Sequence, residues 1–149
     1  MADTSTARLR EGLEEVLGAD PASFVADHRA RYDAVIDTVG GESFLLFGAG
    51  RLGRDALALL RKAGIEPVGF VDNNPKAWGS SVDGVKVWSP SDAVQAHGDR
   101  ALFVVTVYTS APVKAQLRAL GVRVLSFPFV AWAHADVMLP YWPIELPHK

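Results

Sequence analysis

The sequence predicts an α/β fold with a mostly parallel sheet of 4-5 strands and an added N-terminal helical segment. Two observations support this fold class. First, short apolar runs without polar alternation occur at 44–47, 68–71 and 102–107, which is typical of strands buried on both faces of a parallel sheet. Second, stretches with helical periodicity at 52–63 and 110–120 each end at a glycine and lead into a further apolar run. This alternation predicts crossovers between parallel strands.

The N-terminal part has only helical signals. Apolar residues recur at spacings of three and four over 7–17 and again over 21–39. Asp20 is suited to cap the second helix, and Pro21 suits a first position where no N–H group is needed. We expect residues 1–42 to form a helical segment packed on the sheet.

The central part, residues 43–127, carries the sheet. We expect helices on both faces, in the doubly wound arrangement, and the strand order 3-2-1-4-5. Between the second and third strands lies a turn-rich stretch with a further turn at Asp83-Gly84. The third strand, at 85–87, should lie at or near the edge. The elements expected in order are strand 44–47, helix 52–63, strand 68–71, strand 85–87, helix 90–97, strand 102–107, helix 110–120 and strand 122–127.

The last part, residues 128–149, is rich in proline and aromatic residues, including Trp132, Tyr141 and Trp142. We expect a helical turn followed by an extended tail. Large rings are costly to leave in water, so this tail is predicted to be a connection or an interface. The partner would be a second copy of the chain, in a homodimer, or another domain.

A glycine motif follows the first apolar run directly and opens a helix. Its residues are Gly48, Ala49, Gly50, Arg51, Leu52 and Gly53. Asp72 follows Gly50 by 22 positions (72 − 50) and ends the second apolar run. This context matches the dinucleotide-binding fingerprint of a Rossmann-like fold, in which the glycines receive phosphate at a helix N-terminus and the acid binds ribose. The alternative is that the glycines only shape a tight turn.

The opposite wall of this site should come from the end of the strand at 102–107. Tyr108, Thr109 and Ser110 would then line the crevice and contact phosphate, ribose or base. Ser110 has the alternative role of a helix N-cap. Asn73 follows the acid and is also a candidate. Trp78 either stacks on a base or covers the sheet edge.

Composition excludes several classes of function. A net charge of −2 gives no general attraction to nucleic acid or anionic membrane, and the absence of cysteine excludes thiol chemistry. The four histidines are scattered, so we expect no metal site. No catalytic set is recognised. The acidic N-terminus lacks the pattern of a signal peptide and no apolar run has membrane-spanning length, so the sequence predicts a cytoplasmic protein.

A resemblance rests on the glycine turn at 48–53, the strand end Phe70-Val71-Asp72-Asn73-Asn74, and the segments Trp78-Gly79 and 83–87. Residues 43–147 resemble the Rossmann-type module that precedes the catalytic domain of FkbM-type methyltransferases. They are also similar to the nucleotide-sugar-binding domain of PglD-like sugar acyltransferases. The first resemblance implies a methyltransferase domain after residue 149, which this sequence does not contain. Leu46 stands where a methyltransferase's own nucleotide-binding strand carries an acid.

The sequence therefore predicts a nucleotide-binding accessory module, non-catalytic by itself, for NAD or a UDP-sugar-like nucleotide. Asp72 would repel a 2′-phosphate, so NADP should bind less tightly than NAD. Two alternatives remain open at this stage. One is a small enzyme, either a sugar- or polyketide-modifying methyltransferase or an NAD-dependent oxidoreductase. The other is an interaction domain with a vestigial pocket.

Overall fold

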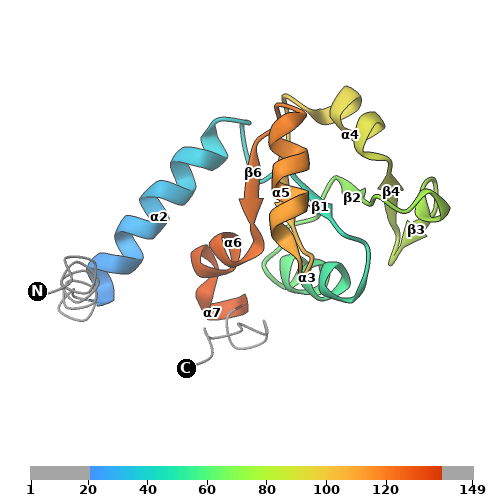
Figure 1. The fold of residues 1–149 in the computed structure, drawn as a ribbon. Helices are drawn as coiled ribbons and strands as arrows, with labels where there is room; N and C mark the ends of the chain where they lie inside the picture. The colour runs from blue at the N-terminus through green and yellow to red at the C-terminus, as the bar shows by residue number, and fades with distance from the viewer. Residues whose placement is uncertain (1–20, 139–149) are drawn as a thin grey trace, which may run out of the picture.

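The structure is a computed structural model and describes residues 21–138. Its centre is a six-stranded sheet with the order β3-β4-β2-β1-β5-β6 (Figure 1). The strands are β1 (Phe44–Phe47), β2 (Gly69–Val71), β3 (Ser81–Val82), β4 (Val85–Trp88), β5 (Leu102–Val105) and β6 (Val124–Ser126). All neighbouring pairs are parallel except β3 and β4. The predicted fold class and the order 3-2-1-4-5 of the five expected strands are confirmed.

Strand β3 was not predicted. It pairs antiparallel with β4 through a hairpin whose turn is Asp83-Gly84, with both residues at positive φ. Two residues are too few to produce a readable apolar pattern. The turn was recognised in the sequence, but the short strand before it was not.

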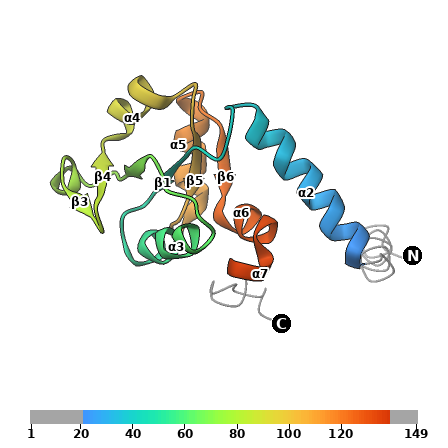
Figure 2. The same ribbon diagram turned by 180° about the vertical axis from the view of Figure 1, so that it is seen from behind.

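Helices cover both faces of the sheet. They are α2 (Pro21–Asp37), α3 (Arg51–Lys62), the 3₁₀ turn η1 (Pro75–Ala77), α4 (Pro90–His97), α5 (Ser110–Ala119), α6 (Phe127–Ala133) and α7 (Ala135–Met138). Alternate residues of each central strand point to opposite faces, which separates two apolar clusters. One cluster joins Leu46 and Val104 to helices α2, α3, α6 and α7, and the other joins Leu45 and Phe103 to α4 and α5. Helix α5 accordingly lies in front of the sheet in Figure 1 and behind it in Figure 2.

Several predicted boundaries were wrong by one or two residues. The strand expected at 102–107 ends at Val105, and the strand expected at 122–127 covers only Val124–Ser126. Phe127 is instead the first residue of α6, because Pro128 follows it and proline is well tolerated in the first helical turn. Helix α2 ends at Asp37 rather than at residue 39. The helix expected at 7–17 and the tail after 138 lie outside the described residues.

Helix α2 runs outward from the sheet, as Figures 1 and 2 both show. It packs against α6, and Tyr32 and Ile36 join the apolar cluster on that side. The rest of its described surface is mostly exposed. The contacts that hold α2 therefore come chiefly from α6, in the helical part of the predicted tail.

Candidate functional site

The glycine turn connects β1 to α3 at the carboxyl edge of the sheet, and two of its glycines are required by packing. Gly48 has φ +115 and is buried, and a Cβ there would lie 2.6 Å from Cγ1 of Val107. A Cβ at Gly53 would overlap the carbonyl oxygen of Gly48. A larger residue at Gly48 would have to displace the Val107 side chain and adopt a backbone conformation that favours glycine, and one at Gly53 would have to move backbone. The inner side of the turn is thus closely packed against β5 and against itself.

The outer side of the turn is open. A Cβ at Gly50 would meet no atom within 4 Å, and the φ of Gly50 is −85. Helix α3 begins directly after this residue, with no side-chain cap and no acid in its first turn. The first N–H groups of a helix have no partner inside the helix and carry partial positive charge. This side of the turn has the backbone geometry that receives a phosphate group.

Asp72 contacts the glycine turn directly. Its Oδ2 accepts a hydrogen bond from the N–H of Ala49 at 3.0 Å, and its Oδ1 accepts one from the N–H of Asn74 at 2.8 Å. The carboxylate therefore fixes the turn and the chain after β2 relative to each other. An ionised carboxylate has about four acceptor positions, so two remain for hydroxyl groups of a ligand. The residues present fit a ribose phosphate on this criterion.

Thr106 supports the same turn from the other side and was missed as a site residue. It is 3% exposed, and its hydroxyl donates to the carbonyl oxygens of Phe47 and Gly48 at 3.0 and 3.1 Å. A hydroxyl at the end of an otherwise apolar strand was the signal that could have found it. Thr106 thereby ties the end of β5 to the end of β1.

The opposite wall begins beyond Thr106. Tyr108 is 73% exposed, and Thr109, not Ser110, is the N-cap of α5, although its side chain makes no capping hydrogen bond. The N-cap role considered for Ser110 is therefore wrong. Ser110 is the first helical residue and is partly buried. Val107, next to Tyr108, is the neighbour that a Cβ at Gly48 would meet, so this loop borders the glycine turn.

Asn73 reaches across to α5. Its side-chain amide exchanges two hydrogen bonds with the amide of Gln116, at 2.9 and 2.8 Å. Beside the pair lies an open groove of about 560 Å³, lined by Asn73, Trp78, Ser89, Pro90, Ser91, Gln116, Ala119 and Leu120. Trp78 is 43% exposed, and its indole N–H donates to the carbonyl oxygen of Asp72 at 2.7 Å. The indole is thus anchored to the same residue that holds the glycine turn.

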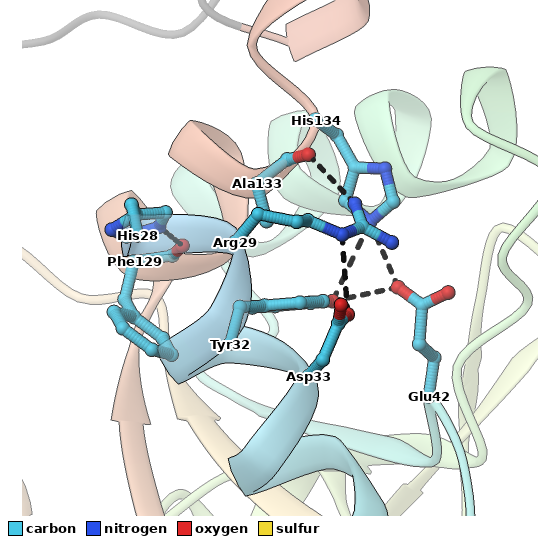
Figure 3. A network of polar contacts seen from close by, with 8 residues as sticks. All are labelled: His28, Arg29, Tyr32, Asp33, Glu42, Phe129, Ala133 and His134. Carbon is cyan, nitrogen blue, oxygen red and sulfur yellow. Dashed lines mark hydrogen bonds and ion pairs between the residues drawn. The ribbon is translucent and has the colours of Figure 1, made fainter. Parts of the chain in front are cut away.

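A second polar cluster joins α2 to α6 and to the segment before β1 (Figure 3). The hydroxyl of Tyr32 donates to Oε2 of Glu42 at 2.6 Å, and the same oxygen lies 2.8 Å from Nε2 of His134. Two further bonds reach α6 carbonyl oxygens, from His28 to Phe129 and from Arg29 to Ala133. Burial raises the pKa of the Tyr32 phenol far above its usual range, and its hydrogen bond to Glu42 raises it further. These contacts explain how the outward-running helix is held.

Within residues 21–138, no three histidine, cysteine, aspartate or glutamate side chains lie together in a way that could hold a metal ion. In the same part of the chain, none of the helices has both the length and the apolar character needed to cross a membrane.

These features define an α/β domain with Rossmann-like strand order and a glycine turn at the carboxyl edge of its central strand. No family model matches the chain, and no curated protein matches it. Among solved structures, the chain is similar to UDP-D-quinovosamine 4-dehydrogenase from Vibrio fischeri. The TM-score is 0.47 at 21% identity, and the match covers 64% of this chain and 86% of that one.

The chain is also similar to RSP, a Rex-family repressor. One structure of RSP gives a TM-score of 0.45 at 20% identity, and a second, of RSP with beta-NAD+ and operator DNA, gives 0.45 at 17%. Both matches cover 78% of this chain and 65% of that one. That nucleic acid is not a partner stays a prediction from the sequence.

Proposed function

We propose that this chain is a nucleotide-binding module for an NAD-like or nucleotide-sugar ligand, non-catalytic by itself. The observation that carries the proposal is the open outer side of the glycine turn at Gly50, beside the uncapped start of α3. The ligand's phosphate groups would lie against residues 48–53. Its ribose would bind the remaining acceptor positions of Asp72. Tyr108, Thr109 and Ser110 would form the opposite wall.

The association with FkbM-type methyltransferases is part of the same proposal and rests on the sequence resemblance alone. In that setting the module would bind the nucleotide and present it to a partner enzyme. The segment from 128 onward would make the contact, as a homodimer interface or with a methyltransferase domain. Trp132, on α6 in this segment, is 42% exposed.

One observation favours the alternative of an interaction domain with a vestigial pocket. Both carboxylate oxygens of Asp72 already accept a hydrogen bond within the chain. In that case the acid would serve only to fix the turn, and no nucleotide would bind. The same experiment decides between the two.

The test is thermal unfolding of the protein with NAD, NADP, UDP-sugars and S-adenosylmethionine, compared with the variant Gly50→Ala. A ligand at about 100 times its Kd adds about 2.7 kcal/mol to the unfolding free energy, or about 5–10 °C for a domain of this size. The added methyl has space in the protein alone but lies where phosphate would approach. A shift with NAD or a UDP-sugar that Gly50→Ala abolishes supports the proposal. The absence of any shift supports the vestigial pocket.

Gly50→Ala is a sharper variant than Asp72→Ala. Removing the carboxylate leaves the N–H groups of Ala49 and Asn74 without their acceptor, so a lost ligand shift could reflect a displaced turn. The unfolding free energy of Gly50→Ala without ligand should stay within about 1 kcal/mol of the wild type. That value is the control for an intact fold.

A further inference from the structure

The groove beside the Asn73–Gln116 pair has the features of a site for a flat ring. Its lining includes the apolar side chains of Pro90, Ala119 and Leu120, and Trp78 adds a large aromatic surface. Leu120 is 41% exposed and Trp78 is 43% exposed, so this apolar surface is in contact with water. Stacking on an aromatic side chain stabilises a bound base by about 1–3 kcal/mol.

The polar side chains that line the groove are those of Asn73, Gln116, Ser89 and Ser91. The reciprocal amide pair offers one donor and one acceptor on each side chain, and each is satisfied by the other at 2.8–2.9 Å. Such a pair between partly exposed residues contributes little net stability, because water replaces it easily. A ring with a neighbouring donor and acceptor on one edge could therefore exchange with one of the two amides at little cost.

One residue, Asp72, is hydrogen-bonded both to the glycine turn and to a residue that lines the groove. Asp72 binds the N–H of Ala49 with its carboxylate and the indole N–H of Trp78 with its carbonyl oxygen. Asn73, the next residue, lines the groove. A ligand whose phosphate lies at Gly50 and whose ribose lies at Asp72 would thus have its ring directed toward the groove.

We propose that this groove binds the flat ring of the nucleotide, with Asn73 and Gln116 reading a ring edge that carries adjacent donor and acceptor groups. This inference rests on the proposed function. The class of ring is an aminopurine, a pyrimidine with a cyclic amide, or a pyridine carboxamide. Trp78 and Leu120 supply the apolar contact, and Gln116 determines which edge fits.

The test compares ribose 5-phosphate with AMP, UMP and nicotinamide mononucleotide by isothermal titration. All four share the sugar phosphate, and they differ in the ring. We expect one of the nucleotides to bind the wild type at least about tenfold more tightly than ribose 5-phosphate. Ala119→Phe, which fills the groove, should reduce this preference to within about twofold. Gln116→Met should reduce it about fivefold. Neither variant should change the affinity for ribose 5-phosphate.

The matched control is Ala115→Phe, one turn earlier on α5, at an exposed position outside the groove lining. It should keep the wild-type preference. If the nucleotides bind no more tightly than ribose 5-phosphate, or if Ala119→Phe keeps the preference, the groove is not the ring site, while the glycine-turn proposal stands. If neither ribose 5-phosphate nor any nucleotide binds, the proposed function fails and this inference fails with it.

Discussion

At the scale of single residues, the glycines of the turn differ in what a methyl group would meet. A Cβ at Gly53 would overlap the carbonyl oxygen of Gly48, whereas a Cβ at Gly50 would enter open space. Gly53→Ala should therefore force backbone to move and destabilise the protein by about 3 kcal/mol. Gly50→Ala should cost about 1 kcal/mol or less. Urea unfolding of both variants measures the difference, and equal losses would contradict this description of the turn.

Thr106 is the second residue whose role can be isolated. Thr106→Val keeps the shape of the side chain but leaves the carbonyl oxygen of Gly48 without the hydroxyl donor in a buried position. We expect a loss of about 1–2 kcal/mol in unfolding free energy. Thr109→Val is the control, since the Thr109 side chain is exposed and makes no capping hydrogen bond. A similar loss in both variants would mean that valine itself, rather than the missing hydroxyl, causes the effect.

At the scale of elements, the attachment of α2 depends on the cluster around Tyr32. The phenol is 1% exposed and donates to Glu42, so its pKa is raised. A group with a raised folded-state pKa contributes its full stability below the unfolded-state pKa, about 10 for tyrosine, and loses it as pH rises further. Tyr32→Phe should cost about 1–2 kcal/mol at neutral pH. This difference from the wild type should shrink above about pH 10.

The measurement is urea unfolding of the wild type and Tyr32→Phe at several pH values on either side of about pH 10. Tyr108→Phe is the control, because Tyr108 is 73% exposed and should change neither the stability nor its pH dependence. If the difference in unfolding free energy between the wild type and Tyr32→Phe stays constant across the whole pH range, the pKa of Tyr32 is not raised in the folded state.

The five parallel strands and their order were predictable because they depend on local patterns and on the short crossovers between them. Apolar runs mark β1, β2 and β5, and parallel crossovers restrict how they pair. The glycine motif was predictable for the same reason, since its residues are contiguous. The Asn73–Gln116 pair joins residues 43 positions apart, and no local pattern in the sequence indicates it.

The Glu42–His134 contact joins residues 92 positions apart. It depends on how α2, α6 and α7 pack, which periodicity does not determine. His134 was therefore grouped with the other scattered histidines, and no pattern in the sequence predicted a role for Glu42. Contacts of this kind follow from the assembled fold rather than from any one element.

At the scale of the whole molecule, the two polar regions have separate roles. The carboxyl edge of the sheet holds the glycine turn, Asp72 and the start of α5, whereas the cluster of Figure 3 fastens α2 to α6. A ligand at the edge would contact the chain after β1, β2 and β5 and so connect elements of both apolar clusters. It would not contact α2.

Hydrogen exchange of the whole chain tests this division. Adding the ligand identified by thermal unfolding should slow exchange at residues 48–53 and 106–110, because their N–H groups are covered or held. Amides of α2 that exchange by global unfolding should slow only as far as the ligand raises the unfolding free energy. The fastest-exchanging amides of α2 exchange by local opening, so their exchange rates should not change. Protection confined to α2 and α6 would place the ligand between those helices. The glycine turn would then be a structural element, and the nucleotide proposal would be wrong.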